Sequence, residues 1–319
     1  MKSVAILMAT YNPNMKWLKE QLLSLESQTY KNLKLYVLDD CSPDVSFIDI
    51  KNMVKRCIKS FSFEISKNEE NLGSCKTFEK LTDIGQGDYF SYCDQDDVWE
   101  KVKIEKLIKE IDNKTSIIYA DLSIIDENGI KTHNSLRDIR KRLRHLEGYG
   151  LAKKILFRNF ITGCTMIVPS DIAKKSIPFV DEMIGDHHIA LYSASKGKVK
   201  YIDEPLVKYR QHESNVTGIL KGVKTKEDYI DVRIAPLIRQ FKKLKKTFKD
   251  DGDMLKTIEK GLIWLDAREK YLRGKMSYLF TIKRYSYLNF KTSLFDLFIP
   301  FMPKKIFKKA LAKIRGESA

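Results

Sequence analysis

Four consecutive residues, Asp94-Gln95-Asp96-Asp97, place three carboxylates in one short segment of the chain. Like charges this close repel each other unless a positive group lies between them. Carboxylate oxygens are ligands that Mg²⁺ and Mn²⁺ prefer, so the segment predicts a divalent metal site. A solvated acidic turn explains the same residues, because Asp97 is well placed to cap a helix that starts near Glu100. Considered alone, the segment supports both interpretations equally.

The carboxylates follow Tyr89–Cys93, a short apolar and aromatic run that is typical of a buried strand. Ligands of open α/β sheets bind outside the carboxyl ends of the strands. Two other polar segments follow predicted strands in the same way, Thr10-Tyr11-Asn12 and Asp39-Asp40. We therefore expect all three segments to meet at one edge of a sheet.

Strands and helices alternate through the first part of the chain. Apolar residues that recur every three to four positions predict helices at about 15–28, 46–59, 74–84 and 100–111. Strands are predicted at 3–9, 33–38, 61–66, 89–93, 116–121 and 160–169. This alternation predicts an α/β fold, with a mostly parallel, doubly wound sheet flanked by helices.

The composition limits the class of protein. With 319 residues, 43% hydrophobic and 31% charged, the chain is typical of a folded protein with one large domain and an appendage. Its five cysteines include no CxxC pair, which argues against a disulfide framework or a zinc site and fits a reducing cytoplasm. No apolar run approaches the ~18 residues of a membrane span, and the N-terminal strand is too short for a signal peptide.

The net charge of +16 is uneven, since residues 271–319 hold eleven Lys and Arg side chains against Asp296 and Glu317. Long basic helices are predicted at about 225–249 and 252–284, and residues 294–303 place aromatic side chains beside prolines. Apolar patches bordered by lysine are typical of segments on an anionic membrane surface. Packing of these helices against the preceding domain explains the same pattern. We expect two domains, 1–220 and a basic α-helical 221–319.

Together, the segments at the strand ends resemble family 2 glycosyltransferases of the GT-A fold, which use nucleotide-sugar donors. The matching segments, within about residues 3–220, are Ala9-Thr10-Tyr11-Asn12, Asp39-Asp40, Asn71-Leu72-Gly73 and Asp94-Gln95-Asp96-Asp97. The run Cys93-Asp-Gln-Asp-Asp-Val-Trp99, followed much later by Tyr209-Arg-Gln-His212, is particularly similar to bacterial polysaccharide rhamnosyltransferases.

The resemblance implies roles for individual residues. Asp96 and His212 would bind a divalent cation, Mn²⁺ or Mg²⁺, that neutralises the leaving diphosphate. Asp94 would lie near the ribose, and Asp97 would support the site. The rest of the nucleotide-sugar pocket would be lined by Thr10, Tyr11, Asn12, Asp40, Asn71 and Lys76. For Asp40, a cap before the next element is the alternative.

The general base would come from Gly185-Asp186-His187-His188, where the resemblance places an acidic residue. Asp186 beside the attacking hydroxyl would give single-displacement transfer with inversion. The alternatives are that His187 is the base, or that Asp186 only caps a helix. Arg210 would either neutralise phosphate or face outward from its strand.

The expected activity is inverting, metal-dependent transfer of a sugar from dTDP-rhamnose or a UDP-hexose to a hydroxyl of a growing cell-surface polysaccharide, linked to a lipid carrier. The enzyme would be cytoplasmic and peripheral at the inner face of the bacterial cell membrane. A nucleotidyltransferase would show a glycine-rich loop where this chain has Thr10-Tyr-Asn-Pro13. A glycoside hydrolase would need two carboxylates but no nucleotide pocket. A nucleic-acid-binding protein would explain the charge, but no recognised motif is present, so no nucleic-acid partner is expected.

Overall fold

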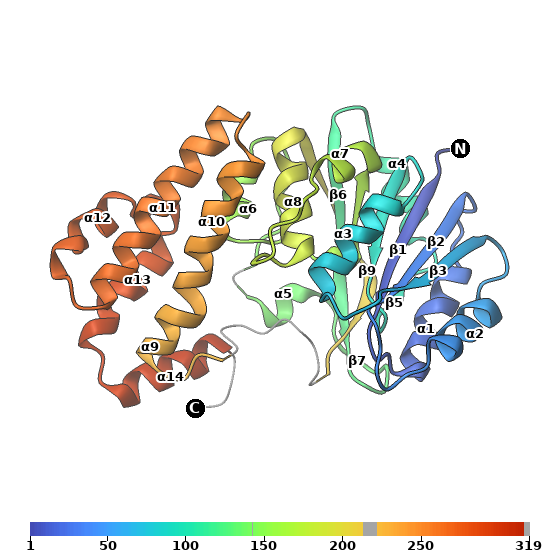
Figure 1. The fold of residues 1–319 in the computed structure, drawn as a ribbon, viewed down its shortest axis with the longest axis horizontal. Helices are drawn as coiled ribbons and strands as arrows, with labels where there is room; N and C mark the ends of the chain where they lie inside the picture. The colour runs from blue at the N-terminus through green and yellow to red at the C-terminus, as the bar shows by residue number, and fades with distance from the viewer. Residues whose placement is uncertain (142, 213–221, 316–319) are drawn as a thin grey trace. The chain divides into compact units, whose positions relative to one another are not determined.

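The computed structural model describes residues 1–141, 143–212 and 222–315 (Figure 1). The chain divides into two compact units, Met1–Glu213 and Ser214–Ala319. The predicted domain boundary between residues 220 and 221 lies outside the described residues.

The first unit is built on one sheet, in which nine strands of the described residues are ordered β3-β2-β1-β4-β8-β6-β9-β5, with β7 paired to β6. The strands β1 to β4 are parallel to one another, whereas β8 runs antiparallel to both β4 and β6. The α/β prediction is confirmed, and the sheet becomes mixed beyond β4. The strands are β1 Val4–Thr10, β2 Leu33–Asp39, β3 Ser62–Lys67, β4 Tyr89–Cys93, β5 Val98–Trp99, β6 Thr115–Ile125, β7 Lys131–His133, β8 Met166–Pro169 and β9 Lys198–Arg210.

Helices flank this sheet (Figure 1). The first begins after Asn14, whose side chain accepts a 3.0 Å hydrogen bond from the Lys16 N–H. Its predicted apolar stripe of Leu18, Leu22 and Leu25 is fully buried. The helices of this unit are α1 Met15–Glu26, α2 Phe47–Cys57, α3 Ser74–Ile84, α4 Lys103–Glu110, α5 Leu136–Ile139, α6 Ala152–Phe157, α7 Ser170–Lys175 and α8 Gly185–Lys196.

The strand order reverses at β1, which has β2 on one side and β4 on the other. Residues 4–8 of β1 are almost completely buried, as expected for a parallel strand covered on both faces. In open α/β sheets, the crevice outside the carboxyl ends of the strands at such a reversal is where ligands bind. The loops that follow β1 and β4, including the acidic segment, lie at this edge.

Two predicted elements of the first unit differ from the structure. Residues 160–169, predicted as a strand broken by Gly163, form a 3₁₀ turn at Gly163–Thr165 followed by β8. The Gly163 N–H bonds to the Asp186 side chain and is therefore not available to a strand ladder. The sequence pattern also predicts two short strands at 198–202 and 206–209, but these residues form one long strand, β9, whose pairing with β6 is irregular around Pro205. Proline has no N–H to donate to the ladder.

The second unit is helical, and its core contains Val223, Tyr229, Ile234, Ile299, Phe307 and Leu311. The helix predicted over 252–284 is interrupted at Gly274, which has a φ of +98°. In the described parts of the chain, no helix is long and apolar enough to cross a membrane. The elements are α9 Lys226–Asp228, a π-helical turn Tyr229–Ile234, α10 Ala235–Thr247, α11 Gly252–Leu272, α12 Leu279–Arg284, α13 Phe290–Phe298 and α14 Lys304–Arg315, with 3₁₀ turns at Met276–Tyr278, Ser286–Leu288 and Ile299–Phe301.

Candidate active site

The acidic segment after β4 meets the segment after β9. Oδ2 of Asp96 lies 2.8 Å from Nε2 of His212. The His212 ring packs against Trp17 of α1, with 4.8 Å between ring centroids. The two residues for which the sequence predicts metal binding are therefore brought together from distant parts of the chain.

Arg210, at the end of β9, stabilises the acidic segment through hydrogen bonds from the interior of the protein. Its backbone N–H donates to Oδ1 of Asp97 at 3.0 Å, and its Nε donates to the Asp96 carbonyl at 2.8 Å. The guanidinium also donates to Glu20 of α1 at 2.6 Å and to the Asp126 carbonyl at 3.2 Å. Arg210 is completely buried, so it does not face outward from its strand as one interpretation expected. Its guanidinium binds protein groups.

The other two carboxylates of the segment lie close to a thiol. Ligand atoms of Asp94, Asp97 and Cys164 all lie within 4.8 Å of one another. Burial, together with the charges of Asp96 and Asp186, raises the pKa of Asp94 to about 7. Burial and the charges of Asp96 and Asp94 raise the pKa of Asp97 well above its usual range. Oδ2 of Asp97 is buried without a hydrogen-bond partner among the described residues.

These properties fit a divalent cation, because carboxylates with raised pKa values lack a compensating positive charge. Carboxylate oxygens suit Mg²⁺ and Mn²⁺, and an imidazole can complete such a donor set. Burial raises the pKa of Cys164 well above its usual range, so this residue is a neutral thiol and a poor ligand for a hard cation. No sequence pattern singled out Cys164.

Lys103 of α4 is a second residue that the sequence analysis missed. It is completely buried. Its Nζ lies 2.9 Å from the centroid of the Trp99 ring and 3.4 Å from Oγ of Ser91. Burial lowers its pKa to about 7, although the acids and thiols near it oppose this shift. Lys103 is therefore only partly charged at neutral pH and offsets the acidic cluster incompletely.

Asp186 lies in the first turn of α8. Its Oδ2 accepts a 3.0 Å hydrogen bond from the N–H of Gly163, and the N–H of His187 also donates to its carboxylate. Burial raises the pKa of Asp186 to about 6 despite these bonds. Its charge raises the pKa of Asp94, so the two carboxylates belong to one electrostatic site.

The two histidines after Asp186 bind backbone carbonyls. Nε2 of His187 lies 2.7 Å from the carbonyl of Ile155 in α6. Nε2 of the buried His188 lies 2.8 Å from the carbonyl of Ser176. A ring nitrogen bonded to a carbonyl must carry the proton, so neither Nε2 is free to accept one.

The loop after β1 is tied to the loop after β2. Thr10 is buried, and its Oγ1 donates to Oδ1 of Asp39 at 3.2 Å. Nδ2 of Asn12 donates to Asp44 at 2.8 Å, and the Asp44 N–H returns a 3.0 Å bond to Oδ1 of Asn12. Thr10 and Asn12 therefore position the two loops through their side chains.

The same loop is tied to the acidic segment through Gln95. Oε1 of Gln95 accepts from the Tyr11 N–H at 2.8 Å, and Nε2 of Gln95 donates to the Tyr11 carbonyl at 3.0 Å. The side chain of Tyr11 stays 45% exposed. Gln95 therefore joins the loop after β1 to the acidic segment.

Asp40 organises the loop before α3. Its carboxylate accepts from the N–H groups of Leu72 and Gly73 at 2.9 and 2.8 Å, and from Nδ2 of Asn68 at 2.8 Å. The next helix, α2, is capped by Ser46, so the alternative that Asp40 caps this helix is wrong. Asn71 is exposed on the loop before α3. Asn68, which the sequence analysis did not select, is buried beside Asp40.

Lys76, expected near the diphosphate, is held by acidic side chains. Its Nζ lies 3.1 Å from Glu79 and 3.1 Å from Asp181. The side chain of Lys76 is 35% exposed. These pairs link α3 to the segment that precedes α8.

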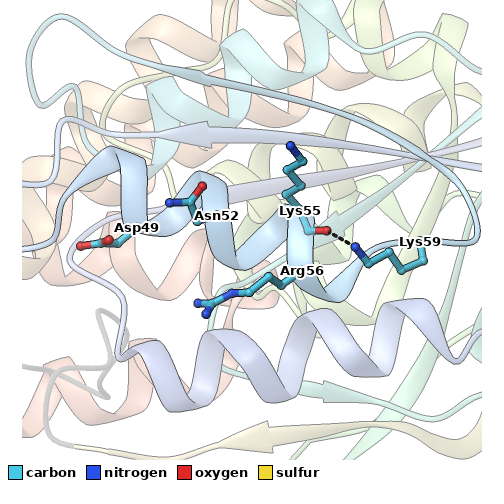
Figure 2. Close-up of a pocket in the computed structure, with 5 residues that line it drawn as sticks. All are labelled: Asp49, Asn52, Lys55, Arg56 and Lys59. Carbon is cyan, nitrogen blue, oxygen red and sulfur yellow. Dashed lines mark hydrogen bonds between the residues drawn. The ribbon is translucent and has the colours of Figure 1, made fainter.

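Two surface hollows contain none of the acidic residues of the site. Figure 2 shows the first, on the exposed side of α2 and the turn after it, lined by Asp49, Asn52, Lys55, Arg56 and Lys59. No residue predicted to act in the site lines it. The second hollow lies beside the Asp40 loop and is lined by Lys67, Asn68, Glu69, Glu70, Leu72 and Lys80. Since Asn68 and Leu72 both bond to Asp40, this hollow adjoins the predicted nucleotide pocket.

Residues 5–172 match the model of the family described as Glycosyl transferase family 2. The chain belongs to this family. The glycosyltransferase is 29% identical to an uncharacterized glycosyltransferase of Methanocaldococcus jannaschii over 213 residues, 65% of this chain and 70% of the relative. It is 25% identical to the dTDP-rhamnosyl transferase RfbG of Shigella flexneri over 269 residues, 80% of this chain and 89% of the relative.

Solved structures show which fold this is. TarS of S. aureus, in complex with UDP-GlcNAc, has a TM-score of 0.59 at 16% identity and covers 99% of this chain and 92% of its own. The mannosyltransferase PcManGT of Pyrobaculum calidifontis, in complex with GDP-Man and Mn²⁺, has a TM-score of 0.57 at 14% identity, with 98% and 85% covered. At these identities the likeness concerns the fold alone. The predicted family, GT-A fold and glycosyltransferase class are confirmed.

Proposed function

We propose that this glycosyltransferase transfers a sugar, with inversion, from a nucleoside-diphosphate sugar to a hydroxyl of a growing cell-surface polysaccharide on a lipid carrier. The observation that carries the proposal is the convergence of Asp94, Asp96 and His212 at the carboxyl edge of the sheet, with Asp186 in the same electrostatic site. The names of RfbG, TarS and PcManGT support a nucleotide-sugar donor. The 25% sequence identity to RfbG favours dTDP-rhamnose as the donor, with a UDP-hexose as the alternative.

Asp96 and His212 would hold a divalent cation, Mn²⁺ or Mg²⁺, with Asp94 beside them. When bound, the cation would supply positive charge to the leaving diphosphate. Asp97 is fixed by the Arg210 N–H and buried, so it supports the segment from behind. The raised pKa of Asp94 supports this assignment, since it indicates negative charge that the protein leaves incompletely balanced.

Asp186 would act as the general base. It takes the proton of the acceptor hydroxyl while the acceptor oxygen bonds to the anomeric carbon. The bond from that carbon to the diphosphate oxygen breaks on the opposite face, which inverts the configuration. A pKa of about 6 leaves the carboxylate mostly deprotonated at neutral pH and still able to accept a proton. The contact of His187 with Ile155 favours Asp186 over His187.

The nucleoside would lie between the loop after β1 and the loop before α3. Oδ2 of Asp40 accepts a bond from Gly73 and has a second lone pair for the N3–H of a pyrimidine. The exposed ring of Tyr11 and the amide of Asn71 would complete this side, positioned by Thr10 and Asn12. Lys76 would exchange its acidic partners for the diphosphate.

The proposed acceptor implies that the enzyme acts at a membrane. A lipid-linked polysaccharide presents its growing end at the inner face of the cell membrane, so we propose a cytoplasmic, peripheral location. The division into a catalytic domain 1–220 and a basic helical region 221–319 fits this location, because positive charge attracts anionic lipid.

Calorimetric titration of the full chain with dTDP and UDP, with and without Mn²⁺, tests the metal and nucleotide assignments. Mn²⁺ should tighten binding at least about tenfold, and Asp96→Asn or His212→Ala should remove that gain. His133→Ala, a histidine of β7, is the matched control and should keep it. An unchanged effect of Mn²⁺ in Asp96→Asn would show the metal assignment to be wrong. In a thermal-shift screen of nucleotide sugars, the true donor should stabilise the chain most.

A further inference from the structure

The second unit contains a helix, α13, whose polar side is buried. Nε1 of Trp264 donates to Oγ of the buried Ser293 at 3.0 Å. The hydroxyl of Tyr229 donates to Oδ1 of Asp296 at 3.0 Å, and Arg268 pairs with Oδ2 of the same residue. Turning α13 around would leave a buried guanidinium without its carboxylate, which is strongly unfavourable. This network therefore fixes the orientation of α13.

The outward side of α13 is apolar. Phe290, Leu294 and Phe298 recur every four residues and are 65%, 44% and 55% exposed. Phe301, in the 3₁₀ turn that follows, is 68% exposed. A surface helix of a soluble domain normally shows the opposite arrangement, with its apolar stripe toward the core. We call these four residues the aromatic face.

The sequence that contains the aromatic face is basic. From Met276 to Ala312 the sequence has one carboxylate, Asp296, which is buried and paired with Arg268. The same stretch contains seven exposed cations, Lys283, Arg284, Lys291, Lys304, Lys305, Lys308 and Lys309. Exposed apolar rings among cations, with no exposed acid between them, match what an anionic membrane surface binds.

We propose that the aromatic face seats the second unit on an anionic phospholipid surface. The three phenylalanines and Leu294 enter the boundary between headgroups and acyl chains, and the surrounding Lys and Arg side chains contact lipid phosphates. A second copy of the chain is a poorer partner, because pairing two such faces would bring like charges together. This surface deepens the peripheral membrane location proposed above and rests on it, but vesicle binding can be measured without the transfer reaction.

Sedimentation of the full chain with vesicles tests the proposal. The wild-type chain should bind phosphatidylcholine vesicles that contain phosphatidylglycerol much more than vesicles of phosphatidylcholine alone. The triple variant Phe290→Ser, Phe298→Ser and Phe301→Ser should lose at least about tenfold in binding. Because all three side chains are exposed, the variant should keep its circular dichroism spectrum and its melting temperature. Lys291→Gln, Lys304→Gln and Lys305→Gln together should reduce the preference for phosphatidylglycerol.

The matched control replaces equally exposed isoleucines of the first unit. Ile48→Ser, Ile84→Ser and Ile130→Ser remove side chains that are 67%, 45% and 64% exposed, and should leave vesicle binding unchanged. Wild-type chain that shows no preference for phosphatidylglycerol, or control and triple variants that lose binding equally, would overturn the proposal. A concentration-dependent dimer without vesicles, abolished in the triple variant, would assign the face to a second copy of the chain instead. Nucleotide binding by the triple variant should equal that of wild type, which separates this test from that of the active site.

Discussion

Gly163 and Asp186 are in direct contact, since the Gly163 N–H donates a 3.0 Å hydrogen bond to Oδ2 of Asp186. A Cβ atom added at residue 163 would lie 2.9 Å from the Cβ of Asp186, closer than such atoms approach in proteins. The bond therefore requires a residue without a side chain at position 163. The 3₁₀ turn before β8 therefore contacts the start of α8 directly and orients the proposed base, Asp186.

Gly163→Ala should displace Asp186 and lower the transfer rate at least about tenfold, because a general base works only within hydrogen-bond reach of its proton. The crowding should also lower the free energy of unfolding by about 1–3 kcal/mol. Turnover assays and urea unfolding measure the two effects. Gly252→Ala, at the start of α11 with nothing within 4 Å of the added Cβ, is the control and should lose neither. Normal turnover in Gly163→Ala would contradict the positioning role.

Asp186→Asn should leave nucleotide binding intact and reduce transfer about a hundredfold to ten-thousandfold. The base acts in its deprotonated form, and burial raises the pKa of Asp186 to about 6. The rate of the wild-type enzyme should therefore fall as the pH drops below about 6. The pH dependence of kcat/KM measures this, with Asp171→Asn, in the first turn of α7, as the control. Turnover retained by Asp186→Asn would move the base to His187.

Arg210→Met should lower the free energy of unfolding by roughly 3 kcal/mol, because it leaves buried hydrogen-bonding groups of the acidic segment unpaired. Arg210→Lys should not restore the free energy of unfolding, since the lysine ammonium group cannot donate to several acceptors in the way that the forked guanidinium does. Urea unfolding measures the change, and the exposed Arg56 of α2 provides a control whose replacement by Ala should cost less than about 0.5 kcal/mol. Equal stability of the two variants would contradict the structural role of Arg210.

Without metal, the stability of the chain should pass through a minimum near neutral pH. Burial, with the charges of Asp96 and Asp186, raises the pKa of Asp94 to about 7, and burial raises that of Asp186 to about 6. The folded chain then binds more protons than the unfolded chain, and stability falls as the pH rises from about 4 to 7. Burial lowers the pKa of Lys103 to about 7, so the unfolded chain binds more protons between about 7 and 10 and stability recovers there.

Thermal unfolding in EDTA across this pH range measures the minimum. Lys103→Met should remove the recovery above neutral pH and leave the fall below it. A bound cation favours deprotonated carboxylates, so Mn²⁺ should raise the melting temperature more at pH 7 than at pH 5. A melting temperature that rises steadily from pH 5 to pH 7 in EDTA would contradict the charge assignment of the cluster.

Local sequence patterns predicted the first half of the fold closely. The helix Ser74–Ile84 and the strand Tyr89–Cys93 have the predicted bounds, because periodicity and flanking glycines determine both locally. Gly163 was predicted to break its strand, but the 3₁₀ turn there could not be predicted, since its cause is a side chain of α8 that is distant in sequence. Helix length in the second unit was overestimated, because basic residues continue past the break at Gly274.

The site residues that directly follow a strand could be predicted from the sequence. Asp96 and His212 meet because β4 and β9 end at the same edge, and the resemblance had assigned both to the metal. Lys103 and Cys164 were not predictable, because a lysine on a helix and a cysteine near a strand normally imply solvent and core respectively. Asn68 was missed because its partner is distant in sequence. Asn68 follows β3 and Asp40 follows β2, and the pairing of these two strands brings the residues together.

The bonds of Arg210 also have a consequence for biosynthesis. Because Arg210 joins α1, the acidic segment and the turn at Asp126, all of which precede it in the chain, this part of the site cannot close until β9 has left the ribosome. His212, two residues later, is equally late. A nascent chain that ends before β9 would carry its acidic segment without these partners. The order of synthesis thus delays activity until the first unit is complete.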